Sequence, residues 1–253
     1  MINRYLLVIV LISGYLSFAQ NKAAKLPPPG KSNINFAKVI GWKDGQMPKA
    51  PAGFTVTKYA EGFESPRWMY VLPNGDVLVA ETNAKYPVLL QAGMVVAGAS
   101  DANNIKRAPN RIEILRDTNK DGMPDFRQTF LSEDQGLNQH LGMLLLDKYL
   151  YIANTDALVR YPYEDGQTKI VVPGEKIIYL PTSGINMHWG KNIITNSDKS
   201  KIYIAVGSAT NIADQGMDDE IMRANILEIN PDGSGLRVYA SGLRNPMGMG
   251  IAP

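Results

Sequence analysis

The most informative segment of the sequence is Ser241-Gly-Leu-Arg-Asn-Pro246, which continues as Met-Gly-Met-Gly-Ile-Ala-Pro to residue 253. The chain contains three earlier versions of it: Gly62-Phe-Glu-Ser-Pro66, Gly136-Leu-Asn-Gln-His140 and Gly184-Ile-Asn-Met-His188. In each version a glycine and an apolar residue precede two mostly polar positions, then Pro or His, and then an apolar segment. Self-similarity at intervals of some tens of residues is typical of repeat architectures. The sequence therefore predicts a fold built from repeated units.

Short apolar segments separated by turns follow these lead-ins, with no convincing amphipathic helix anywhere. The strands expected in the first unit are 68–72, 77–81, 111–115 and 126–131. Those of the second are 141–146, 149–153 and 157–161, and those of the third are 190–195, 202–206, 225–229 and 236–239. Four-stranded antiparallel units that recur at roughly 50 to 75 residues predict an all-β fold of β-propeller blades. A β-sandwich is the alternative, but it would not need the repeated lead-in.

Three blades and the start of a fourth are expected, since residues 247–251 read as one further strand. A closed propeller has at least about four blades. We therefore expect residues 51–253 to be the N-terminal part of a longer propeller domain, truncated before its C-terminal blades and with open sheet edges. An isolated strand at Val56–Tyr59 matches the last strand of a blade, and we expect it to complete the final blade and close the ring.

The N-terminus predicts export from the cell. Residues 1–20 combine Arg4, an apolar run at 5–16 and the small residues of Ser17-Phe-Ala19, which is the pattern of a secretory signal peptide. An uncleaved membrane anchor is the alternative, although the run is short for a span. Residues 21–50 read as an N-terminal arm. The absence of Cys and a net charge of +2 favour a bacterial periplasmic or secreted protein with no nucleic-acid partner and no stable membrane span after cleavage.

The residues just before each innermost strand are the main candidate site, because propeller geometry brings them together at one mouth beside the central axis. They are Glu64, Ser65, Asn138, Gln139, His140, Asn186, Met187, His188, Arg244 and Asn245. Two long loops, 83–110 and 208–224, are expected on the same face. Both histidines of the chain fall in this set. An imidazole can take a proton near neutral pH and a guanidinium can hold an oxyanion, so the pattern favours proton abstraction from a hydroxyl over a purely structural wall.

A second candidate site is Asp117-Thr-Asn119-Lys-Asp121-Gly-Met-Pro-Asp125. Its oxygen-bearing side chains occupy positions 1, 3, 5 and 9 of a calcium loop, with glycine at position 6. Gln128 stands where such a loop has its bidentate Glu, so the match is incomplete. A structural calcium ion and a plain turn held by Asp and Asn side chains both agree with this pattern. Either would lie on the face away from the mouth.

Several motifs resemble the glucose/sorbosone dehydrogenase family over roughly residues 51 to 253. They are His188-Trp189, Lys201-Ile-Tyr-Ile-Ala-Val-Gly-Ser208, Ile226-Leu-Glu-Ile-Asn-Pro-Asp-Gly-Ser-Gly235 and Gly242-Leu-Arg-Asn-Pro246. Ser65-Pro-Arg-Trp68, Pro73-Asn-Gly-Asp-Val77 and Ala153-Asn-Thr-Asp-Ala-Leu-Val-Arg160 are similar to its sorbosone/pyranose dehydrogenase branch. Members are six-bladed propellers that use pyrroloquinoline quinone (PQQ) with calcium, so the resemblance implies both cofactors.

The resemblance also implies roles for individual residues. His188 matches the general base that takes the proton of the sugar hydroxyl. Arg244 and Asn245 match the pair that holds the quinone oxygens, and Gln139 matches a further cofactor ligand. The backbone oxygens of Met247 and Gly248 resemble those that bind the cofactor's calcium. The family's later basic residues belong to blades outside these 253 residues, and His140 stands where Pro is usual, which leaves a wall or supporting role for it.

The resulting hypothesis is a PQQ-dependent dehydrogenase that oxidises a sugar or sugar aldehyde and passes the electrons to an external acceptor. A metal-dependent, lactonase-like propeller hydrolase is one alternative. It would need a carboxylate-rich metal site, and Glu64 is the one acidic residue in the predicted mouth. A non-catalytic binding propeller is the other alternative, in which His188 and Arg244 would only line a ligand mouth.

Overall fold

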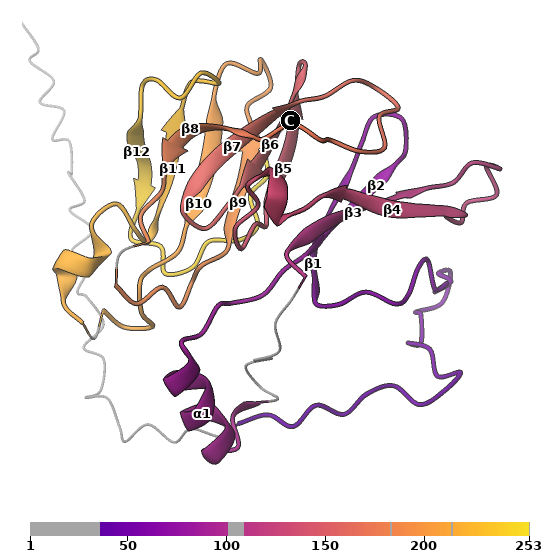
Figure 1. Cartoon of the computed structure of the whole chain (residues 1–253), viewed down its shortest axis with the longest axis horizontal. Coiled ribbons are helices and arrows are strands. Elements are labelled where there is room, and N and C mark those ends of the chain that lie inside the picture. The colour runs from indigo at the N-terminus through magenta and orange to yellow at the C-terminus, as the bar shows by residue number, and fades with distance from the viewer. Residues whose placement is uncertain (1–35, 101–108, 183, 214, 253) are drawn as a thin grey trace, which may run out of the picture. The chain divides into compact units, whose positions relative to one another are not determined.

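The computed structural model describes residues 36–100, 109–182, 184–213 and 215–252, which contain three four-stranded antiparallel sheets (Figure 1). The first sheet consists of β1 (Pro66–Val71), β2 (Val77–Glu81), β3 (Arg111–Arg116) and β4 (Phe126–Leu131). The second consists of β5 (Met143–Leu146), β6 (Tyr149–Ala153), β7 (Ala157–Pro162) and β8 (Glu175–Tyr179). The third consists of β9 (Lys191–Thr195), β10 (Ile202–Val206), β11 (Asn225–Ile229) and β12 (Arg237–Ser241). Each sheet is a meander of strands in chain order. The predicted all-β, partial propeller is confirmed.

The second sheet packs between the other two because successive side chains of a strand point to opposite faces. On β6, Leu150 and Ile152 belong to a buried cluster that includes Ile112 of the first sheet. Tyr151, between them, belongs to a second cluster that includes Ile204 of the third sheet. Fully burying such a side chain contributes about 1.5–3 kcal/mol. These two clusters therefore hold blade against blade, and they fix the mouth ends of the strands relative to one another.

The third sheet shows how strand register places the candidate site. β10 pairs with β9 on one side and β11 on the other, so that Val206 lies opposite both Lys191 and Asn225. The segment before β9, the segment after β10 and the segment before β11 consequently emerge at one end of the sheet. These segments carry His188, Ser208 and the end of the 208–224 loop.

A helix, α1 (Val88–Val96), lies in the long loop between β2 and β3, where the sequence predicts none. The sequence predicts a loop here because a surface helix is expected to show an apolar stripe opposite a polar one. This segment, VLLQAGMVV, is apolar nearly all round and has no buried residue, so it has no such stripe. Pro87 precedes the first helical residue, a position at which proline is compatible with a helix.

The predicted strand at Val56–Tyr59 does not form, so the expectation that it completes a blade is not realised within the described residues. The chain just beyond it lies on the outer face of the first sheet instead of along a sheet edge. There Ala60 and Phe63 pack against the cluster of Val77, Val79 and Leu115. Without a neighbouring strand, residues 56–59 cannot form the inter-strand hydrogen bonds of a sheet.

The strand predicted at 247–251 is also absent from the described structure. This segment has no strand partner there, and the carbonyl oxygen of Met247 accepts a hydrogen bond from the Asn192 side chain instead, at 2.6 Å. The predicted signal peptide and the first part of the arm lie outside the described residues, while 36–50 contain neither helix nor strand. Among the residues that the structure describes, no helix combines the length and apolarity needed to cross a membrane.

Candidate functional site

Lead-in residues of the second and third sheets make polar contacts with loops of the preceding sheet. Lys85 follows β2, and its Nζ donates to Oδ1 of Asn138, which precedes β5, at 3.1 Å. Asn186 precedes β9, and its Nδ2 donates to Oγ1 of Thr155 in the β6–β7 loop at 2.9 Å. These contacts link the first sheet to the second and the second to the third, while a ligand-binding mouth at this end stays a prediction.

Three further lead-in residues, Glu64, Ser65 and Met187, make contacts through their backbone groups. Glu64 donates its N–H to the Oε1 atom of Glu81, and the Ser65 carbonyl accepts the N–H of Thr82 at 3.2 Å. The N–H of Met187 donates to the carbonyl of Ala209 at 2.9 Å. These contacts tie each lead-in to the end of its neighbouring strand.

His188 is half-buried and its imidazole has a defined orientation. Nδ1 lies 2.9 Å from the Ser208 carbonyl oxygen and 3.0 Å from Ser208 Oγ. The Ser208 hydroxyl donates its own hydrogen to the Thr210 carbonyl at 2.6 Å, so towards the ring both oxygens act as acceptors. A carbonyl oxygen can only accept. Nδ1 must therefore carry the hydrogen, and Nε2 is left with the lone pair that a proton acceptor needs.

Asn245 lies beside His188, with Gly207 between them. A Cβ atom on Gly207 would stand 2.4 Å from the Cβ of His188 and 2.7 Å from Asn245 Oδ1, distances that no real Cβ contact allows. The N–H of Ser208 donates to the Arg244 carbonyl at 2.8 Å, which fixes the Arg244–Asn245 turn against the end of β10. The glycine is thus what permits the predicted base and the predicted cofactor ligand to approach.

Arg244 is exposed, and its guanidinium is held by the loop between β10 and β11. Nε donates to the Asn211 carbonyl at 3.0 Å, and Nη2 donates to Asn211 Oδ1. A guanidinium has five N–H donors in a planar fork, so these contacts orient it and leave donors for a carboxylate or a quinone oxygen. A guanidinium with donors to spare suits an anionic, oxygen-rich ligand.

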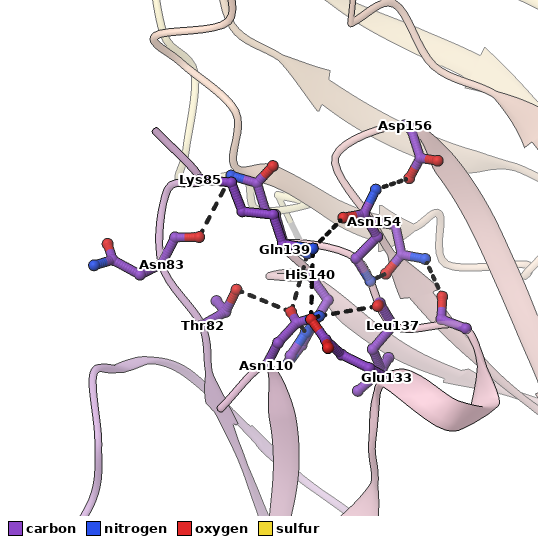
Figure 2. A network of polar contacts seen from close by, with 12 residues as sticks. Thr82, Asn83, Lys85, Asn110, Glu133, Leu137, Gln139, His140, Asn154 and Asp156 are labelled. Carbon is purple, nitrogen blue, oxygen red and sulfur yellow. Dashed lines mark hydrogen bonds and ion pairs between the residues drawn. The ribbon is translucent and has the colours of Figure 1, made fainter. Parts of the chain in front are cut away.

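Gln139 stands at the junction of the first and second sheets, in the contact network of Figure 2. Its backbone has a φ of +44°, a left-handed conformation that long side chains rarely adopt. Its N–H donates to Asn110 Oδ1 at 3.0 Å, and its Nε2 donates to the Asn83 carbonyl at 3.4 Å. Gln139 is therefore held by residues of the first sheet's long loop, whereas His188, Arg244 and Asn245 are grouped by the third sheet.

His140 is completely buried, with 0% of its surface exposed. Burial lowers the pKa of His140 from 6.5 to about 3, so the imidazole is neutral at neutral pH. A side chain without exposed surface cannot reach a substrate, which makes His140 a wall residue. Of the two histidines that the repeat places at the mouth, only His188 has a geometry suited to proton transfer.

Met247 and Gly248, the predicted backbone ligands of a calcium ion, follow the Arg244–Asn245 turn. The Met247 carbonyl already accepts the hydrogen bond from Asn192, and a carbonyl oxygen has a second lone pair that a cation could use. Gly248 is exposed. The donors present here are oxygens, as calcium prefers, so the residues are compatible with the ion.

The loop from Asp117 to Asp125 forms a turn whose acidic side chains bond its own backbone. Asp117 accepts the N–H groups of Lys120 and Gly122, each at 2.7 Å, and Asp125 accepts the N–H of Thr118 at 2.8 Å. Asn119 and Asp121 accept the N–H groups of Asp121 and Met123 at 3.0 and 2.9 Å. Within the described parts of the chain, no three His, Cys, Asp or Glu side chains come together as a metal site. Calcium binding at this turn stays a prediction.

The turn and the mouth lie at opposite ends of β3. Asn110 precedes that strand and takes part in the mouth network, whereas Asp117 follows it. An ion at this turn would therefore be structural and not part of the chemistry.

Sequence reasoning missed Lys191, the first residue of β9, which has no exposed surface. Its Nζ donates to the carbonyls of His188 and Trp189, each at 3.4 Å. Burial, and to a lesser extent the nearby Arg223, lower the pKa of Lys191 from 10.5 to about 7. A lysine at the start of a predicted strand, three residues after the candidate base, was the available signal.

Among solved structures, the fold is similar to the holo form of the pyranose dehydrogenase PQQ domain from Coprinopsis cinerea, with a TM-score of 0.53 and 15% identity. That match covers 74% of this chain and 41% of the domain. The PQQ-bound aldose sugar dehydrogenase from Streptomyces coelicolor is similar at a TM-score of 0.48 and 19% identity, over 75% of this chain and 54% of that one. No protein-family model and no curated protein matches the chain.

At identities this low, structural similarity establishes the fold only. The reaction must be inferred from the residues of the site. This chain spans less than half the length of the pyranose dehydrogenase domain that it resembles. It folds as part of a β-propeller of the kind seen in the pyranose dehydrogenase PQQ domain.

Proposed function

We propose that this chain belongs to a PQQ-dependent dehydrogenase that oxidises a sugar or a sugar aldehyde. The observation that carries the proposal is the orientation of His188. Its Nδ1–H is held by two oxygens of Ser208, and its Nε2 is the nitrogen left to accept a proton. The grouping of His188, Asn245 and Arg244 around Gly207, together with the propeller fold, supports the same reading.

His188 acts as the general base of this reaction. Nε2 takes the proton of the substrate hydroxyl, and the resulting imidazolium keeps both oxygens of Ser208 as partners for Nδ1–H. Because those acceptors are in place before the proton arrives, little reorganisation is needed when the positive charge forms. General-base catalysis of this kind contributes about 10²- to 10⁴-fold in rate.

Arg244, Asn245 and Gln139 hold the cofactor. When bound, the quinone supplies the two-electron acceptor for the hydride that leaves the sugar carbon, so that a carbonyl remains on the substrate. Arg244 would oppose the negative charge of the quinone through its guanidinium, and the side-chain amides of Asn245 and Gln139 would donate hydrogen bonds to quinone oxygens. The carbonyl oxygens of Met247 and Gly248 would hold calcium beside it.

The electrons then pass to an external acceptor, and the reaction takes place outside the cytoplasm, in the periplasm or the medium. The signal-like pattern at residues 1–20 and the absence of Cys support this location. The activity is that of the full-length protein, because this chain corresponds to 41% of the pyranose dehydrogenase domain in the structural match.

The test is reconstitution of the full-length protein with PQQ and calcium, followed by dye reduction on a panel of aldoses and sugar aldehydes. His188→Asn is the variant to compare, since an amide can replace the contact to Ser208 but cannot take a proton. We expect quinone-dependent turnover that falls about 10²- to 10⁴-fold in His188→Asn while quinone binding is kept.

Three results would contradict the proposal. Dye reduction without added quinone would mean that the oxidation does not depend on PQQ, and lactone hydrolysis with metal alone would favour a hydrolase. A protein that binds neither quinone nor calcium and oxidises no sugar would favour a binding propeller.

A further inference from the structure

Asn110 is the centre of the polar network shown in Figure 2, and no sequence motif pointed to it. Its carboxamide is buried, with 3% of the residue exposed, and it precedes β3 at the end of the long loop. Nδ2 donates to Glu133 Oε1 at 2.8 Å and to the Leu137 carbonyl at 2.9 Å. Because both partners are acceptors, the orientation of the amide is determined, and Oδ1 must face the other side.

Three donors converge on that oxygen. They are the backbone N–H of Gln139 at 3.0 Å, the Thr82 hydroxyl at 3.3 Å and the His140 ring at Nδ1, 3.2 Å away. Oδ1 can only accept, so His140 carries its hydrogen on Nδ1. The buried, neutral imidazole is therefore a fixed donor, and it occupies the wall behind Gln139.

The backbone conformations explain why an asparagine is needed. Asn110 has a φ of +51° and Gln139 a φ of +44°. Asparagine is among the few residues with a side chain that adopt this left-handed region readily, whereas glutamine does so at a cost. A residue in such a conformation persists only where its surroundings hold it there. For Gln139 the hydrogen bond from its N–H to Asn110 supplies that restraint.

We propose that Asn110 is the positioning residue that sets Gln139 at the mouth for ligand contact. This inference deepens the proposed function and rests on it in one respect, namely that the ligand of Gln139 is the quinone. Without the Asn110 carboxamide, the Gln139 backbone is free to leave the left-handed region, and its side-chain amide moves away from the position it has here. Asn110 acts through Gln139 and has no contact with the reacting atoms.

Asn110→Gly is the informative variant, because glycine keeps the left-handed backbone and removes only the side-chain bonds. Asn74→Gly is the matched control. Asn74 likewise orders a turn through its side chain, with Asp76 as its partner at 3.0 Å, but at the other end of β1. Both variants are made in the full-length protein, and each is also combined with Gln139→Ala.

The first measurement is amide hydrogen exchange without any quinone. We expect the segment 136–142 to exchange at least about tenfold faster in Asn110→Gly than in the wild type or Asn74→Gly, with β6 unchanged. Equal exchange of this segment in the wild type and Asn110→Gly would overturn the inference. This measurement is informative even if the protein binds no PQQ. Failure to bind PQQ would contradict the proposed function but not the positioning role of Asn110.

The second measurement is PQQ affinity and turnover. Loss of one restraining hydrogen bond predicts quinone binding weakened about fivefold to tenfold in Asn110→Gly, with a smaller change in turnover at saturating quinone. Because Asn110 acts through Gln139, the double variant Asn110→Gly/Gln139→Ala is expected to bind no more weakly than Gln139→Ala alone. Additive losses in the double variant would mean that Asn110 supports the fold in general, and would contradict its positioning role.

Discussion

At the residue scale, Ser208 fixes the tautomer and the orientation of the His188 ring. Both of its oxygens accept from Nδ1, so the neutral imidazole has a single tautomer, with Nε2 available to accept a proton. This arrangement uses a carbonyl and a hydroxyl in place of a carboxylate, so the ring is oriented without a second ionisable group beside it.

Ser208→Ala tests this contribution, since it removes Oγ and keeps the carbonyl. We expect turnover to fall about threefold to tenfold, as for the loss of one hydrogen bond, with little change in KM. The measurement is steady-state kinetics at saturating PQQ, and a change in KM alone would show that Ser208 acts on substrate binding and not on the base.

Lys191 predicts a pH dependence of stability. Its pKa is lowered from 10.5 to about 7 by burial, so between these values the unfolded chain binds more protons than the folded one. The free energy of unfolding should therefore rise with pH from about 7 to about 10.5. Below about pH 7 Lys191 is protonated in both the folded and the unfolded state, so it adds no pH dependence there. Lys191→Met removes this group while preserving an unbranched apolar chain.

Denaturant unfolding at several pH values between 6 and 10 checks this expectation. The difference in unfolding free energy, wild type minus Lys191→Met, should increase across the range by a few kcal/mol. A difference that is independent of pH would mean that Lys191 has an ordinary pKa in the folded protein.

At the scale of elements, most strands were predictable because they have a local signal, but β8 (Glu175–Tyr179) was not predicted. β10 and β11 were predicted with the bounds that the structure has, since their apolar runs end at clear turns. Helix α1 was missed because it has no polar face, and the segment at 56–59 was overpredicted because alternation alone does not supply a partner strand. Asn110 could not be found from the sequence, since its role depends on a left-handed backbone and on contact with Leu137 and Gln139.

Gly207 connects the end of β10 with the site, and its replacement is a test at this scale. In Gly207→Ala the new methyl group would overlap His188 and Asn245, so one of them must move. We expect turnover to fall at least about tenfold while circular dichroism still shows the sheets. Gly93→Ala in α1 is the control, because its Cβ would meet nothing within 4 Å. Equal activity in both variants would show that the predicted base and ligand are not held by this contact.

At the scale of the whole molecule, the stacking of the three sheets places candidate site residues from distant parts of the sequence at one end of the strands. Gln139 is held there by the first sheet's long loop, while Arg244 and His188 are held by the third sheet. The repeated lead-in allowed this convergence to be predicted, because equivalent positions of stacked blades must lie at the same end. The restraints that orient each side chain could not be predicted, since they come from loops that differ between the units.

We propose that this end of the sheets binds a quinone through Arg244, and a titration of the full-length protein with PQQ and calcium tests this binding. Arg244→Ala is compared with Arg237→Ala, which removes an exposed arginine of β12 whose partner is Glu228. Charge-assisted hydrogen bonds are worth about 1.5–3 kcal/mol, so we predict binding weakened about 10- to 100-fold in Arg244→Ala and unchanged in Arg237→Ala. Quinone binding by Arg244→Ala at wild-type affinity would contradict the account.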